Sequence, residues 1–227
     1  MAIAKHIAQI NTSSKGLPRT LFLLIALLFG SILLVSCEEP EPTEELPSGV
    51  SGYVNGFAYV DLGLSVKWAT CNVGAYAPDD YGNYYAWGET GFKTEYTREN
   101  SVMDSVEIGD IGGNPLYDVA TVRYGAPWRL PTAEEVDELV ANCTYSWETV
   151  HGIVGGRLTS KINGNSIFLP GAGHLFKDNL YNLGGGFYWT SIPNGLNGAR
   201  ILSMGNAGVA NSSWQRCFGC TVRSVVK

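Results

Sequence analysis

The fold is decided by the stretch Trp128-Arg129-Leu130-Pro131-Thr132-Ala133-Glu134-Glu135, which marks the start of the clearest helix in the chain. Thr132 can accept a hydrogen bond from the backbone N–H of Glu135, and the Glu135 carboxylate can reach back to the backbone N–H of Thr132, which together form a capping box. The apolar residues that follow at helical spacing are Val136, Leu139 and Val140. They predict a helix that buries one face and ends near Asn142.

Short stretches elsewhere in the chain have the composition of β-strands. The chain has 28 glycines, and they separate stretches rich in aromatic and β-branched residues, which is typical of short strands joined by long loops. The predicted strands span residues 57–62, 66–69, 84–87, 187–191, 199–203 and 221–226. Residues 158–162 and 165–169 are predicted to form a hairpin around Asn163-Gly164, a dipeptide that tolerates the positive φ values of a type I′ turn. One main helix among short antiparallel strands predicts an α+β domain.

The middle of the chain carries two weaker signals. Asp118 can cap a brief helical turn over residues 119–123. Residues 91–115 show little hydrophobic periodicity, so we expect a long loop there.

The first 36 residues have the features of an export signal. Three basic residues and no acidic residue occur in them, and an apolar run spans residues 21–35, which is typical of a signal peptide. The run is shorter than the about 20 residues that a spanning helix needs. It ends in Leu34-Val35-Ser36-Cys37, which resembles the lipobox of bacterial lipoproteins. We therefore predict a signal peptide over 1–36, lipidation of Cys37 and attachment to a membrane through its acyl chains.

Residues 37–50 are predicted to be a tether between the lipidated cysteine and the folded domain. They contain five glutamates and three prolines, a composition that stays extended and solvated because it cannot bury apolar surface. An acidic cluster directly after the lipidated cysteine resembles the surface-export signal of Bacteroidetes lipoproteins. This resemblance implies an outer-membrane protein that is exposed at the cell surface. The folded domain is expected to occupy residues 51–227.

The balance of charge argues against nucleic acid as a partner. The whole chain has a net charge of −6, and loss of the three basic residues of the signal peptide brings the predicted mature chain to −9. Five of these negative charges are the glutamates of the tether, which leaves −4 on the domain. An acidic domain is repelled by phosphate backbones and by anionic lipid surfaces.

Four cysteines remain besides Cys37, and an even number in an exported chain suggests disulfides. The candidates are Cys71, Cys143, Cys217 and Cys220. We expect a Cys71–Cys143 bridge first. A Cys217–Cys220 bridge is a further possibility, but it requires a turn at Gly219, because strand residues three apart point to opposite faces.

The sequence offers no catalytic constellation, so we expect no enzymatic activity, no cofactor and no metal. His151 and His174 stand apart in loop-like sequence, and no G-x-S-x-G motif accompanies them. Asp104, Glu107 and Asp110 gather in the predicted long loop, but they lack the spacing of a calcium-binding loop. A binding role therefore fits the sequence better than catalysis.

A series of short strings occurs in a specific order along the domain. The strings are WATCNVG (68–74), WGET (87–90), WRLPTAEE (128–135), IFLPGAG (167–173), YWTS (188–191) and VRSV (222–225). Over residues 59–226 they resemble the Fibrobacter succinogenes major paralogous domain, a lipoprotein-associated family. The resemblance implies a C-type-lectin-like fold, related to that of formylglycine-generating enzymes. The shared strings themselves supply no nucleophile paired with a base.

The last forty residues resemble the variable region of target proteins of diversity-generating retroelements. In such proteins a C-type-lectin-like scaffold displays variable side chains for ligand binding. The resemblance implies a protein or glycan ligand, and its candidate contacts are Asn194, Asn197, Ile201, Ser203, Asn206, Asn211, Ser212, Ser213, Trp214, Gln215, Arg216 and Phe218. Trp214, Arg216 and Phe218 are the most attractive of these, because aromatic residues and arginine dominate recognition hot spots.

Two alternatives to free ligand binding remain open. The same surface could serve a structural role in a pilus or envelope assembly. Formylglycine-generating enzymes oxidise a substrate cysteine with copper held by a C-terminal cysteine pair, and Cys217 and Cys220 lie in the corresponding stretch. They are three residues apart where the enzyme pair is five apart, which puts a copper site in doubt.

Overall fold

Antiparallel strands dominate the computed structural model, which describes residues 45–227. The strands are β1 (Gly52–Val54), β2 (Phe57–Val60), β3 (Lys67–Ala69), β4 (Cys143–Val150), β5 (Ile153–Ser160), β6 (Ser166–Pro170), β7 (His174–Phe176), β8 (Asn179–Tyr181), β9 (Gly186–Asn194), β10 (Gly198–Gly205), β11 (Gly208–Gln215) and β12 (Val225–Val226). The helices are α1 (Val119–Tyr124) and α2 (Ala133–Asn142). The described part is therefore α+β-like and mainly β. The predicted signal peptide, Cys37 and most of the tether lie outside the described residues.

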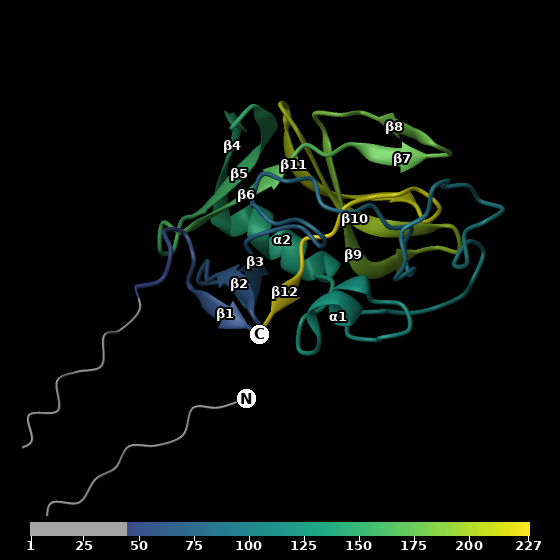
Figure 1. The fold of residues 1–227 in the computed structure, drawn as a ribbon, viewed down its shortest axis with the longest axis horizontal. Coiled ribbons are helices and arrows are strands. Elements are labelled where there is room, and N and C mark those ends of the chain that lie inside the picture. Colours follow the sequence, from purple (N-terminus) through teal and green to yellow (C-terminus); the bar gives the residue numbers. More distant parts are fainter. Residues whose placement is uncertain (1–44) are drawn as a thin grey trace, which may run out of the picture. The chain divides into compact units, whose positions relative to one another are not determined.

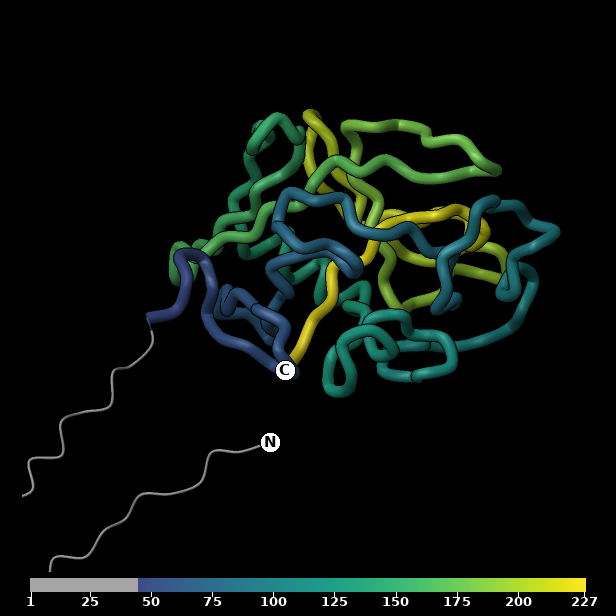
Figure 2. The backbone as a smooth tube through the Cα atoms, viewed as in Figure 1, coloured from purple at the N-terminus to yellow at the C-terminus, as the bar shows by residue number. Residues whose placement is uncertain are grey.

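The strands form separate small sheets rather than one continuous layer (Figure 1). Their strand orders are β1-β2-β3-β12, β4-β5-β6, β9-β10-β11 and β7-β8. Strands β4 to β6 and β9 to β11 are meanders joined by short turns, so each strand pairs with its neighbour in sequence. The exception is β12, which pairs antiparallel with β3 and places Val225 opposite Trp68. The C-terminus therefore lies beside the start of the domain, as the tube in Figure 2 shows.

Helix α2 begins where the sequence predicts. The Thr132 hydroxyl accepts from the Glu135 N–H at 3.2 Å, and the Glu135 carboxylate accepts from the Thr132 N–H at 2.8 Å, which confirms the capping box. Arg129 donates to the same carboxylate at 2.8 Å and so ties the incoming chain to the first turn. Val136 and Leu139 are fully buried, and α2 lies between the β4–β6 sheet and the β9–β11 sheet (Figure 1). The predicted helix and its buried face are confirmed.

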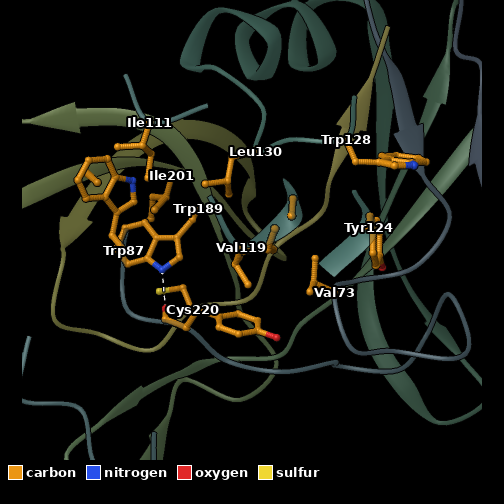
Figure 3. Close-up of a cluster of buried hydrophobic side chains, with 14 of the residues drawn as sticks. Val73, Trp87, Ile111, Val119, Tyr124, Trp128, Leu130, Trp189, Ile201 and Cys220 are labelled. Atoms are coloured by element: carbon orange, nitrogen blue, oxygen red, sulfur yellow. Dashed lines mark hydrogen bonds between the residues drawn. The ribbon is translucent and has the colours of Figure 1, made fainter. Parts of the chain in front are cut away.

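Two apolar clusters fill the interior. One contains Trp68 together with the buried side of α2 and the inner residues of β5, β6 and β10. The other gathers Trp87, Trp128 and Trp189 around residues of the long loop and of α1 (Figure 3). The Trp189 Nε1–H donates to the Tyr85 carbonyl at 2.7 Å, so this deeply buried indole leaves no polar atom unpaired.

Several strand predictions are confirmed, with shifted ends. Strands β2, β3, β9 and β10 lie within or over the predicted stretches. Residues 84–87 form no strand, because only Tyr85 makes a single bridge, to Cys220. The predicted strand 221–226 is reduced to β12. Asp118 caps α1 as predicted, and residues 91–115 contain neither a helix nor a named strand.

The predicted hairpin exists, but its predicted turn type is wrong. Strands β5 and β6 pair as expected, yet only Gly164 of the Asn163-Gly164 dipeptide has a positive φ, of 78°. The residues between the strands number five, too many for a two-residue turn. A two-residue turn with both φ values positive instead joins β4 to β5 at His151-Gly152, with φ of 48° and 88°.

The Cys217–Cys220 bridge is not formed, since all four described cysteines have free thiols. The backbone explains why: Gly219 and Cys220 both lie in extended bridges, to Leu175 and Tyr85. The turn at Gly219 that this disulfide requires is replaced by extended chain.

The Cys71–Cys143 bridge is not formed either. Cys143 begins β4 and is buried in the same cluster as Trp68. Cys71 follows β3 and lines a surface pocket. The two thiols therefore occupy different environments.

Among the described residues, neither helix has the length and apolar content to span a bilayer.

Candidate functional site

The candidate contacts from the sequence fall mainly on the hairpin of β10 and β11. Its register pairs Gly198 with Gln215, Ala199 with Trp214 and continues without a break to Gly205 and Gly208. Alternate residues of a strand face opposite sides, so the hairpin divides the candidates between its two faces. The pairing of β10 with β9 is irregular between Ala199 and Ile201, close to the end that carries Trp214.

A pocket of about 370 Å³ opens at this end of the hairpin. It is lined by Arg98, Asn197, Gly198, Ser213, Trp214, Gln215 and Phe218. Five of these seven residues are sequence candidates, and the structure brings them together at one place. Arg98 lines the pocket but is not among the sequence candidates, because it lies in a loop without periodicity or a motif.

The apolar wall of the pocket belongs to a larger aromatic cluster. The rings of Trp214 and Phe218 lie 5.7 Å apart, and the imidazole of His174 lies 5.4 Å from Trp214 and 5.2 Å from Phe218. Phe187 completes the cluster at 5.2 Å from Trp214. His174 is 5% exposed, and burial lowers its pKa, which favours the neutral imidazole. A neutral aromatic cluster therefore supports the wall from behind.

The polar side of the pocket comes from the long loop and from the β9–β10 turn. Arg98 donates through Nε to Asp104 at 3.2 Å, with 51% of the Arg98 side chain exposed. Ser105 lies next along the loop, and its hydroxyl approaches the Asn197 side-chain oxygen at 3.5 Å. The loop and the turn therefore close the pocket from two sides.

The prediction that Arg216 is an exposed contact is wrong. Arg216 has no exposed surface, and its guanidinium stacks over the Trp87 ring at 4.4 Å. It donates to the carbonyls of Gly195 (2.7 Å), Gly198 (2.9 Å), Met103 (3.0 Å) and Val106 (2.7 Å). Arg216 is therefore a positioning residue. It holds the long loop and the β9–β10 turn beside each other, and these two segments border the pocket.

The remaining candidates lie outside the pocket. Ile201 is buried in the core, which overturns its prediction as a contact. Asn211 donates to the Ala133 carbonyl and to Asp137, each at 3.0 Å, so its amide is committed to α2. Ser203 and Ser212 are half-buried strand residues, Asn194 is the exposed last residue of β9, and Asn206 lies in an exposed turn.

A second pocket, of about 600 Å³, lies between the start of the domain and β6. Its charged groups satisfy one another or a neighbour, since His151 pairs with Asp79 at 3.0 Å and Arg157 with Glu148 at 2.6 Å. Cys71 is its only cysteine. None of the candidate contacts lines this second pocket.

Metal chemistry has little support in the described residues. No group of three or more His, Cys, Asp or Glu side chains is placed to hold a metal ion in residues 45–227. Burial raises the pKa of the Cys217 thiol and, more strongly, that of Cys220, which disfavours the thiolates that metals bind. Of the acidic residues that gather in the long loop, Asp104 is engaged by Arg98 and Asp110 accepts from the Gly112 N–H.

Comparison with known proteins gives no relative. No family model, no curated protein and no solved structure matches the chain.

Proposed function

We propose that this chain is a surface lipoprotein whose folded domain, of the C-type-lectin-like class, binds a ligand without transforming it. The observation that carries the proposal is the pocket at the end of the β10–β11 hairpin. It combines the aromatic wall of Trp214 and Phe218 with a few convergent polar groups, and this combination is typical of small ligand sites.

The chemistry of the lining supports binding rather than catalysis. Amides, a hydroxyl, an indole, a phenyl ring and one guanidinium line the pocket. Acid–base catalysis needs a group whose pKa lies near the working pH and which reaches the reacting atom. His174 lies behind the aromatic wall rather than in the lining, and burial lowers its pKa. The pocket therefore suits recognition through stacking and hydrogen bonds.

The predicted anchor fits the same function. Lipidation of Cys37 would hold the domain at the outer surface of the cell, and the acidic tether would let it reach a ligand away from the membrane. Incorporation of a labelled fatty acid tests this part, because we expect the label in the native chain and none in Cys37→Ser. Label retained in Cys37→Ser would overturn the proposed anchor.

Binding is tested with the predicted mature chain, residues 37–227, carrying Cys37→Ser so that it stays free of lipid. We expect it to retain a ligand from arrays of glycans and of peptides, and Trp214→Ala to weaken that binding at least about tenfold, as at a hot spot. Tyr76→Ala is the matched control, since Tyr76 is 99% exposed and outside the pocket.

Gln215→Lys is a second variant that tests the pocket even if Trp214→Ala fails to fold. Gln215 is exposed, so this change alters the pocket rim without disturbing the core. Ligand retention that is equal in native chain, Trp214→Ala and Gln215→Lys would place binding elsewhere and contradict the proposed site.

A further inference from the structure

Two arginine side chains, Arg98 in the lining and the buried Arg216, bring positive charge to the pocket. Arg98 pairs with Asp104, whereas Arg216 donates only to carbonyls and forms no ion pair in the described residues. Burial lowers the pKa of Arg216, and the charge of Asp104 opposes that shift. The charge of Arg216 therefore adds to that of Arg98 beside the pocket. Lys93 and Glu89 form a pair of their own at 2.9 Å and leave this balance unchanged. The site is locally cationic within an acidic domain, which favours an anionic ligand over a cationic one.

Arg98 is placed to bind that anion. A guanidinium carries five N–H donors, and Arg98 uses Nε toward Asp104. Its two terminal nitrogens donate to no other described residue, and half of the side chain is exposed at the pocket rim. A carboxylate can accept from both terminal nitrogens in the bidentate geometry that makes such pairs strong and directional.

The rest of the lining fits a ring that carries hydroxyl groups. Each hydroxyl of a sugar both donates and accepts hydrogen bonds. The pocket offers groups that can also do both, namely the amides of Asn197 and Gln215 and the hydroxyl of Ser213. The apolar face of such a ring can pack against Trp214 and Phe218. The rings of Trp214 and Phe218 are tilted by 57° to one another, so they form one corner for a compact ring rather than the row of alternating side-chain pockets that an extended peptide needs.

We propose that the pocket binds an acidic glycan, with the carboxylate of a hexuronic acid residue on Arg98 and the sugar ring against Trp214 and Phe218. The inference rests on the proposed function and names the ligand class of the same site. Salt screens the attraction between the ligand carboxylate and the one exposed guanidinium. We therefore expect the affinity to fall as ionic strength rises.

The test compares acidic polysaccharides with their carboxyl-reduced, neutral counterparts. The probes are polygalacturonate, alginate, hyaluronan and glucuronoxylan, each in both forms, with the chain from 37 to 227 carrying Cys37→Ser. We expect binding to at least one acidic polysaccharide, loss of that binding on carboxyl reduction, and a loss of about tenfold or more in Arg98→Gln. Arg98→Lys should recover part of the affinity but not all, because lysine keeps the charge and loses the bidentate fork.

Arg123→Gln is the control, because Arg123 is an exposed arginine outside the pocket. Equal binding of acidic and reduced forms with no effect of Arg98→Gln would overturn the acidic ligand while leaving a glycan-binding pocket. Binding of peptides alone, lost in Trp214→Ala, would overturn the glycan but keep the proposed function. Failure to bind any array member would overturn both.

Discussion

Arg216 and Arg223 lie seven residues apart, and each is buried without a carboxylate partner among the described residues, yet they hold different regions of the molecule. Arg223 donates to the Asn72 side-chain oxygen (2.8 Å) and to the carbonyls of Ala69 (3.1 Å), Thr70 (2.8 Å) and Phe168 (3.0 Å). These partners lie at the end of β3 and in β6. We call the sheets that pack around Trp68 and α2 the framework. Arg216 binds carbonyls of the long loop and of the β9–β10 turn, beside the pocket.

The difference lies in what else holds each region together. The segments around Arg223 are strands or strand ends that pack against the buried tryptophan core. The segments around Arg216 are loops, in which backbone carbonyls find few partners of their own. Removing either arginine leaves buried oxygen acceptors without their donors, so both arginines are costly to remove. The framework has other support, whereas the pocket depends on Arg216.

Arg223→Met should have the largest effect on stability. It leaves four buried oxygen acceptors without their donor, and we expect the free energy of unfolding to fall by about 3–5 kcal/mol. Urea denaturation measures this change. Arg200→Met is the matched control, because Arg200 is only half-buried and makes no side-chain ion pair in residues 45–227, so it should change stability little. Equal losses in the two variants would show that Arg223 is not a framework residue.

Arg216→Met should lower stability less, by about 2–3 kcal/mol, since the freed carbonyls lie in loops that can turn toward water. Arg216→Lys should recover only part of the loss, because one ammonium lacks the spread of donors with which the guanidinium reaches carbonyls of both the long loop and the β9–β10 turn. Urea denaturation of the two variants gives both values. Full recovery by lysine would mean that charge alone, and not the fork of donors, is required.

Thr132→Ala should cost about 1 kcal/mol, the usual effect of losing a helix N-cap. Its influence should stay within the framework, so pocket binding measured on the same ligand array should remain unchanged. The stability difference is read from thermal unfolding. Loss of binding in this variant would show that the framework and the pocket are coupled more tightly than their contacts indicate.

Acidification should have the smallest effect of the four. Burial lowers the pKa of His174 below 6.5, so the unfolded chain takes up the proton first as pH falls. The contribution of neutral His174 is present above pH 6.5 and is lost as the pH falls below it. The unfolding free energy of the native chain minus that of His174→Phe, measured from pH 7.5 to 5, should become more negative or less positive as the pH falls through that window. A difference that is constant across the range would contradict the pKa shift.

The sequence is most informative where structure is local. The capping box of Thr132 and Glu135 and the Asp118 cap involve neighbours in the chain, and both are confirmed. Strand β4 has β-branched and aromatic residues but begins directly after α2 without a turn signal, and β11 has mostly small or polar residues, so neither stands out as a separate strand. Both strands escaped prediction for this reason.

The site could be predicted in part. Five of the pocket residues were recognised through a resemblance in the last forty residues, and three of them, Ser213, Trp214 and Gln215, are consecutive on β11. Arg98 and the burial of Arg216 could not be read from the sequence, since they depend on contacts between residues about 100 positions apart. The presence of arginine at position 216 was informative. Its burial, however, depends on carbonyl groups that lie far away in the sequence.

Hydrogen–deuterium exchange of Arg216→Met tests most directly whether the pocket is a separately held unit on a stable framework. We expect faster exchange in residues 103–106 and 195–198, with α2 and the β4–β6 sheet unchanged. Unchanged exchange in both loops, or an equal increase throughout the domain, would contradict the separation of pocket and framework.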